Sequence, residues 1–196
     1  LKAFTPVELV HFARLRKIDP AHPGMLNFYT EFLREKGESE EPEVAQEAKS
    51  RHLTILGDAL RVAESPEQKA ELGVQLARTA QASGATERAI DAWKAVQRLD
   101  PAHEEASHAL RDLYKRGEKW NALVEVMKAE LDALPAASDD ADIRTRRVGL
   151  LRELIAIYRD ELHLDVMVIN SFNALLEELG IPEVGGDVDV AEWLHR

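Results

Sequence analysis

Proline recurs along this sequence at intervals that limit the fold more than any other feature does. Proline has no backbone N–H and clashes with the preceding helical turn, so it stands at the start of a helix or between helices. Five of the eight prolines stand just before or at the start of every second expected helix, at intervals of 46, 35, 34 and 47 residues. They are Pro20, Pro66, Pro101, Pro135 and Pro182. Two helices with two turns fill about such a length. We therefore expect four helix–turn–helix pairs, over residues 21–66, 67–101, 102–135 and 136–182.

Capping signals indicate where several helices begin. Thr5 and Glu8 have the spacing of a capping box, which predicts a leading helix over residues 5–18. Ser65 opens a later helix in the same way. A further capping box near the last residue predicts a truncated capping helix over residues 189–196.

Stop signals follow the apolar runs. Gly37 comes after apolar residues at helical spacing and is expected to end a helix in the left-handed conformation, and Gly84 and Gly180 are expected to end two more. Asp100 and Pro101 are expected to close one helix and cap the next.

One segment allows a different interpretation. Residues 166–169 are rich enough in β-branched side chains to form a short strand, but helical spacing of apolar residues continues directly after them. We therefore expect a helix over residues 165–179 and an all-α fold. Trp93 and Trp120 fall at helical spacing among leucine and alanine, which predicts core positions for both.

Composition excludes several classes of protein. The net charge of −11 argues against duplex DNA or RNA as a partner, because such binding depends on Lys and Arg neutralising phosphates. No apolar run approaches the ~20 residues that a membrane span needs. The absence of cysteine excludes disulfides and thiolate chemistry and is compatible with a reducing compartment, so we expect a cytoplasmic location. The chain starts at Leu1 without a signal peptide, and we expect it to have been excised from a longer protein.

Residues for catalysis or metal binding do not form a recognisable pattern. The seven histidines include no HExxH motif and no pair four residues apart, so we expect no metal site and no cofactor. His108 and Asp112 lie one helical turn apart, as a general base and its orienting carboxylate would, but a solvent-facing polar pair is the simpler interpretation. We expect no catalytic residues.

A basic cluster interrupts the acidic sequence at Arg144, Arg146 and Arg147. It is either part of a binding surface or a local partner of the aspartates just before it. The second interpretation is favoured, because surface charge runs usually form only local pairs; those aspartates are Asp139, Asp140 and Asp142.

The region 70–135 resembles the tetratricopeptide repeat. The resemblance is carried by small, aromatic and closing-proline positions that recur at the 34-residue spacing of that family. These positions are Leu76, Ala77, Gly84, Ala89, Trp93 and Pro101, followed by Leu110, Tyr114, Trp120, Leu123 and Pro135.

The resemblance implies a right-handed α-solenoid of antiparallel helix pairs, in which the first helix of each pair lines a groove for a peptide or partner helix. Carried over position by position, the groove residues are Asn27, Arg34, Arg78, His108, Asp112, Lys115, Arg152 and Arg159.

Three functions compete on these grounds. A non-catalytic scaffold that binds a protein or peptide in the groove is the leading hypothesis. The alternative is a structural spacer that associates with itself or with further repeats through its terminal repeats, since uncapped terminal repeats leave apolar faces uncovered. A helical-repeat enzyme is third.

Overall fold

A computed structural model describes residues 5–136 and 138–181 of the chain. Over these residues it contains nine α-helices and no strand, so the all-α prediction is confirmed. The helices are α1 (Pro6–Ile18), α2 (Pro23–Gly37), α3 (Pro42–Val62), α4 (Pro66–Ala82), α5 (Thr86–Leu99), α6 (Glu104–Arg116), α7 (Trp120–Ala133), α8 (Ala141–Asp160) and α9 (Asp165–Glu178).

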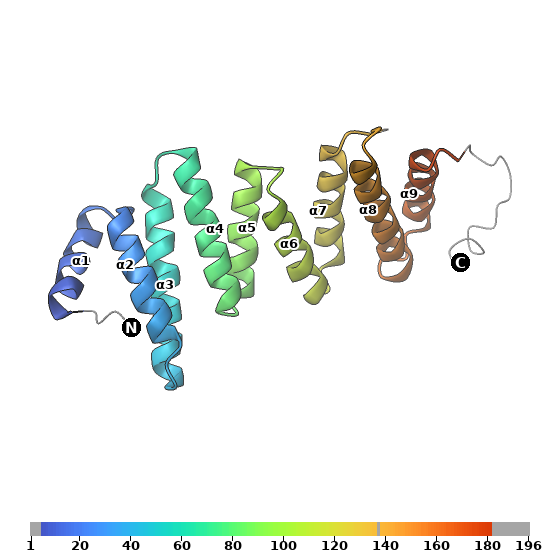
Figure 1. The fold of residues 1–196 in the computed structure, drawn as a ribbon. Helices are drawn as coiled ribbons and strands as arrows, with labels where there is room; N and C mark the ends of the chain where they lie inside the picture. Colours follow the sequence, from blue (N-terminus) through green and yellow to red (C-terminus); the bar gives the residue numbers. More distant parts are fainter. Residues whose placement is uncertain (1–4, 137, 182–196) are drawn as a thin grey trace. The chain divides into compact units, whose positions relative to one another are not determined.

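The chain forms two compact units, Leu1–Leu113 and Tyr114–Arg196, with the boundary inside α6. In the first unit α1 packs on α2, α2 on α3, α3 on α4 and α4 on α5. In the second unit α7 packs on α8 and α8 on α9. Connections alternate between the two ends of the helices, so consecutive helices within each unit run in opposite directions (Figure 1). This arrangement is a helical repeat.

Burial repeats with the period that the prolines predict. Side chains buried in α4 and α5 have buried counterparts 34 residues later in α6 and α7. The matched pairs are Leu72 and Ala106, Leu76 and Leu110, Ala80 and Tyr114, Ala89 and Leu123, Ile90 and Val124, Trp93 and Met127, and Val96 and Glu130. The two helix pairs therefore use the same positions for their cores, with a glutamate in one place where the other pair has a valine.

The turns inside the pairs also repeat. Gly84 takes a left-handed φ of 74°, and the N–H of the next residue donates to the carbonyl of Ala80 at 2.9 Å. Thirty-four residues later Glu118 has a φ of 51°, and the N–H of Lys119 donates to the carbonyl of Tyr114, also at 2.9 Å. Both are Schellman endings, which satisfy carbonyls left over at a helix C-terminus.

The capping predictions hold at α1 and α4. Thr5 and Glu8 form the reciprocal capping box, and the Ser65 hydroxyl accepts from the N–H of Gln68 at 3.1 Å. Gly84 and Gly180 end helices in the left-handed conformation, as their positions predict, and residues 166–169 are helical. The predicted helix 189–196 and Pro182 lie outside the described residues.

Three local predictions are wrong. Gly37 still belongs to α2, and Glu38 ends the helix with a φ of −92°, so no left-handed stop is needed there. Asp100 closes α5 but does not cap α6, because the imidazole Nδ1 of His103 accepts from the N–H of Ala106 instead, at 3.2 Å. Trp120 is only half-buried, because it stands at the first residue of α7, whereas Trp93 is buried as predicted.

A histidine is buried in the first helix pair. His52 of α3 lies with its Nε2 3.3 Å from the hydroxyl of Thr30 on α2, and only 9% of the residue is exposed. Burial lowers the pKa of His52 below its ordinary value of 6.5, because the charged imidazolium loses its hydration. The folded protein therefore holds this side chain neutral at a pH where the unfolded chain would protonate it.

We expect replacement of Glu118 by glycine to stabilise the protein by about 1 kcal/mol, because a side chain in the left-handed conformation is strained and glycine is not. Urea denaturation of Glu118→Gly measures the change. Gly84→Ala is the matched control and should lose a similar amount, since it places a Cβ at the equivalent left-handed position. Equal stability of Glu118→Gly and the wild type would contradict the repeated turn geometry.

We expect the protein to lose stability on mild acidification through His52. Because its pKa is lower in the folded state, the unfolded chain binds more protons as the pH falls through 6.5, and this favours unfolding. The free energy of unfolding, measured from about pH 8 to about pH 5, should therefore decrease more in the wild type than in His52→Gln, which keeps a polar side chain but does not titrate. Parallel curves for the two proteins would show that His52 does not contribute.

Candidate binding surface

The eight predicted groove residues all lie on the first helix of a pair. We call them the first-helix stripe: Asn27 and Arg34 on α2, Arg78 on α4, His108, Asp112 and Lys115 on α6, and Arg152 and Arg159 on α8. Asp112 is half-buried and the other seven are exposed. On the same helices the core side chains point the other way, for example Tyr29, Leu76 and Leu154, which are at most 8% exposed. Packing therefore does not require the stripe.

In the first unit an ion pair joins two first helices through the stripe. The guanidinium of Arg78 on α4 donates from Nε and Nη2 to the two carboxylate oxygens of Glu105 on α6, at 2.6 and 2.5 Å. This two-point contact holds the pKa of Glu105 below its ordinary range. The stripe on α4 therefore faces α6, and Arg78 already has an anionic partner.

The second unit contains a longer contact of the same kind. Lys115, in the last turn of α6, has its Nζ 3.9 Å from a carboxylate oxygen of Glu153 on α8. Both side chains are substantially exposed, so water and salt screen this pair and it contributes little to stability. The contact shows that the end of α6 lies next to the exposed side of α8.

The two arginines of α8 differ from each other. Arg159 donates to both oxygens of the neighbouring Asp160, at 2.6 and 2.9 Å, and lowers the pKa of that carboxyl group. Over residues 5–136 and 138–181, no ion pair links Arg34 or Arg152 to a carboxylate. These two exposed guanidiniums are the cations of the stripe that a partner could use without displacing an acidic side chain.

The basic cluster has different partners from those that the sequence predicts. Arg146 donates from Nε and Nη2 to a carboxylate oxygen of Glu130 on α7, at 3.0 and 2.9 Å, and Arg147 binds Glu178 on α9 at 2.5 Å. The predicted local pairing is therefore wrong for both. Asp140 caps α8 instead, accepting from the N–H groups of Asp142 and Ile143, and Arg144 donates to the carbonyl of Ser138.

Arg147 connects three helices of the second unit. Besides Glu178, it donates from Nη1 to the carbonyls of Leu131 and Leu134 at the end of α7, at 2.9 and 2.8 Å. Its side chain is 12% exposed and that of Glu178 is 7% exposed. Arg147 is therefore bonded to three acceptors, and two of them are carbonyls at the end of a helix that would otherwise lack partners. We infer that Arg146 and Arg147 stabilise the fold and do not bind a ligand.

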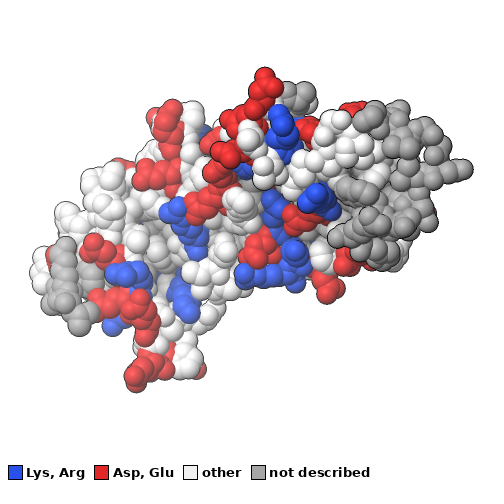
Figure 2. Space-filling view, turned by 45° about the vertical axis from the view of Figure 1, so that its right-hand side comes forward, with Lys and Arg blue, Asp and Glu red and all other residues white. Residues whose placement is uncertain are grey.

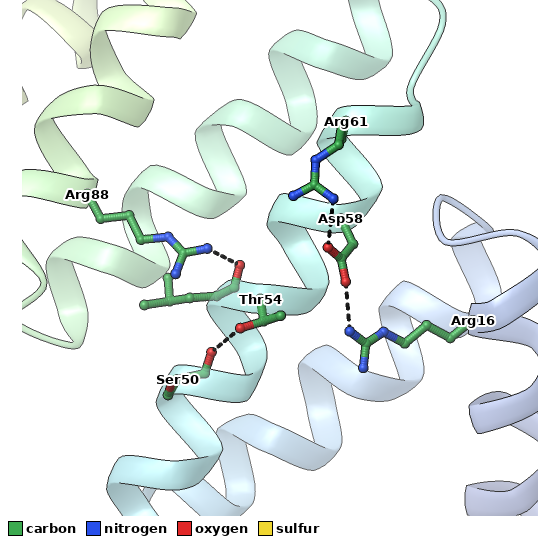
Figure 3. Close-up of polar contacts among 7 residues, drawn as sticks. Arg16, Ser50, Thr54, Asp58, Arg61 and Arg88 are labelled. Carbon is green, nitrogen blue, oxygen red and sulfur yellow. Dashed lines mark hydrogen bonds and ion pairs between the residues drawn. The ribbon is translucent and has the colours of Figure 1, made fainter.

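Arginines also connect helices in the first unit (Figure 3). Arg16 of α1 binds the carboxylate of Asp58 on α3 at 2.7 Å, which lowers the pKa of Asp58, and Arg61 binds the other oxygen at 3.2 Å. Arg88 of α5 donates to the carbonyl of Leu53 at 2.8 Å. A Cβ at Gly57 would lie 3.1 Å from this guanidinium, so the glycine leaves room for it.

Charges of both signs are interleaved on the surface. On the face drawn in Figure 2, Lys and Arg side chains lie among Asp and Glu side chains and form no separate basic area. In the described part of the chain, no three His, Asp or Glu residues are grouped closely enough to hold a metal ion. Among the described helices, none has the length and apolar character that crossing a membrane requires.

Comparison with known proteins gives a distant structural likeness. No protein-family model matches the sequence, and no curated protein matches it. The fold is similar to the crystal structure of BtubC (BKLC) from P. vanneervenii, with 14% sequence identity and a TM-score of 0.40 over 90% of this chain and 72% of that chain. We draw no functional conclusion from a likeness at this level.

We expect Arg146→Leu to lower the free energy of unfolding by about 2 kcal/mol, because it leaves the buried Glu130 without its main counter-charge. The double variant Glu130→Val with Arg146→Leu should recover most of that loss, since a valine occupies the matching core position in the preceding pair. Urea denaturation at neutral pH measures all three proteins. Arg144→Leu is the control and should cost less than about 1 kcal/mol, because Arg144 is exposed. A double variant no more stable than Arg146→Leu would contradict this account.

Proposed function

We propose that this protein is a non-catalytic interaction module that binds a peptide or a partner protein through the first-helix stripe. The observation that carries the proposal is that polar side chains unused by packing stay exposed on the first helix of each pair, while the arginines needed for structure lie elsewhere on the helices. Within each unit, such a surface offers several separate contacts to a partner. That is the form of binding common in helical-repeat proteins.

Charge favours a partner with acidic side chains among apolar ones. Arg34 and Arg152 can each form a charge-assisted hydrogen bond with a carboxylate. Apolar residues of a partner can cover Val148 and Ala156, which are half-buried and lie one turn from Arg152 on α8. The ion pair of Arg78 with Glu105 places a positive and a negative group side by side on the stripe, so a partner can contact either charge there. The resemblance to the tetratricopeptide repeat adds that the helix pairs form a right-handed solenoid with this stripe on its concave side, and we propose this together with a cytoplasmic location.

Site-specific photo-crosslinking tests which face binds. A photoreactive amino acid is placed at Asn27 or Arg152 on the stripe, and at Lys94 or Lys128, which are exposed on the second helices α5 and α7, as matched controls. Proteins crosslinked from both stripe positions and from neither control position are identified and then measured with the purified chain by calorimetry. Crosslinks from the control positions alone would assign binding to the second helices and overturn the proposal.

We expect Arg152→Glu with Arg159→Glu to weaken binding of a partner identified in this way by about 1–3 kcal/mol, the range for charge-assisted hydrogen bonds. The melting temperature should stay within a few degrees, because both side chains are exposed and the partner of Arg159 is its own neighbour. Calorimetric titration gives the affinity and circular dichroism the melting temperature. Unchanged affinity would leave these arginines as a solvated surface.

A further inference from the structure

Large apolar side chains that remain exposed are concentrated on the first and last described helices. On α1, Val7 is 77% exposed and Ile18 is 81% exposed; on α9, Val166 is 69% exposed. Val10 and Ile169 are more than half exposed on the same two helices. Between these helices, the described residues contain three such side chains: Val62 and Leu99, each alone on its own helix, and Leu164, directly before α9. Single exposed apolar residues are ordinary, whereas grouped ones mark interaction sites.

The exposed apolar side chains of α1 lie together on one face. Val7, Val10 and Ile18 recur at helical spacing, while Leu9, Phe12 and Leu15 on the other side are only half-buried. The ring of Phe12 stacks on Phe28 of α2, with ring centroids 4.3 Å apart, which fixes the inner side of α1. A helix that is apolar on both sides is typical of one buried between two neighbours. The described contacts of α1, with α2 and through Arg16 with Asp58 of α3, leave Val7, Val10 and Ile18 exposed.

The faces of α1 and α9 carry opposite charge. Arg14 and Lys17 accompany Val10 on the exposed face of α1, and α1 as a whole has three basic residues against one glutamate. α9 contains three acidic residues and no lysine or arginine, and because Glu178 is buried against Arg147, the exposed negative charge of this helix comes from Asp165 and Glu177. Glu177 lies on the same exposed face of α9 as Val166 and Ile169. Each face therefore complements the other in charge and in apolar character.

We propose that the chain associates head to tail, with the Val7–Val10–Ile18 face of α1 in one copy packing against the Val166–Ile169 face of α9 in a second copy. The two surfaces are different, so each bound copy leaves one α1 face and one α9 face free. Such a heterologous contact repeats from copy to copy, into a closed ring or an open chain. This inference is independent of the first-helix stripe and does not require its partner.

Two variants with opposite ends blocked test the proposal. The head variant is Val7→Glu with Val10→Glu, which places acidic groups against the acidic α9 face. The tail variant is Val166→Asn with Ile169→Asn, which removes the apolar contact and adds no positive charge that could attract the glutamates of the head variant. Sedimentation velocity from micromolar to near-millimolar concentration should show the wild type growing in mass, and each variant alone should be weakened at least tenfold in association. An equimolar mixture should form one-to-one dimers and nothing larger, because the free tail of one variant meets the free head of the other.

The controls separate this contact from other occupants of the two faces. Val62→Glu and Leu99→Glu change apolar residues on α3 and α5 that are each 46% exposed, and these variants should associate as the wild type does. A monomeric wild type, a head or tail variant that still associates alone, or a mixture that stays monomeric would each overturn the proposal. A variant that still associates alone would indicate a symmetric contact between copies. A mixture that stays monomeric would indicate that one of the two faces is covered in some other way.

Crosslinking provides a measurement that does not depend on charged variants folding. The sequence contains no cysteine, so Val10→Cys and Ile169→Cys each introduce a single thiol into separate copies. Mild oxidation of a mixture, in which an added oxidant takes the two electrons released as two thiols become one disulfide, should join unlike copies in preference to like ones. Predominant joining of like copies would exclude the head-to-tail arrangement.

Discussion

Each of the described helices has apolar side chains that it cannot bury alone, and the rest of the structure depends on that constraint. Burial of a leucine- or tryptophan-sized side chain contributes about 1.5–3 kcal/mol, so a helix is stable where its neighbours cover these side chains. In each unit, helices that are adjacent in the sequence bury one another's apolar side chains. Trp93, for example, is only 1% exposed. The opposite side of each first helix is not needed for packing in the core and carries polar residues.

Arginines provide the second level of organisation. Packing sets which helices are neighbours, and guanidiniums then join these helices through carbonyls and carboxylates, as Arg147 does at the end of α7 in the second unit and Arg88 does within α3 in the first. The planar, multiple-donor guanidinium suits this role because one side chain satisfies several acceptors at once. The cations that remain, such as Arg34 and Arg152, are those that the fold does not use.

Much of the fold could be predicted from the sequence because its determinants are local. Thr5 and Ser65 cap helices through contacts three residues away, and the 34-residue spacing of the prolines is the spacing of the buried positions. What escaped prediction depends on residues far apart in the sequence. Arg146 and Arg147 reach α7 and α9 and not the nearby aspartates, and Glu118 adopts the left-handed conformation because the turn of the repeat demands it, although its side chain disfavours it.

The candidate surface was predictable only as a set of positions. Helical spacing and the family resemblance place its eight residues on the first helices, but neither could indicate that Arg78 and Arg159 already hold carboxylates. That distinction depends on side-chain geometry across helices. A signal for the buried pair did exist, since Glu130 stands where the preceding repeat has Val96.

That buried pair also bears on how the repeat can change over time. Glu130 and Arg146 occupy different helices, and each makes the other acceptable in its surroundings. A lineage that loses either one alone passes through a less stable protein, whereas substitutions on the exposed stripe carry no such penalty. The interior of this helix pair is therefore expected to diverge slowly and by linked substitutions, while the exposed first-helix stripe is free to change one residue at a time.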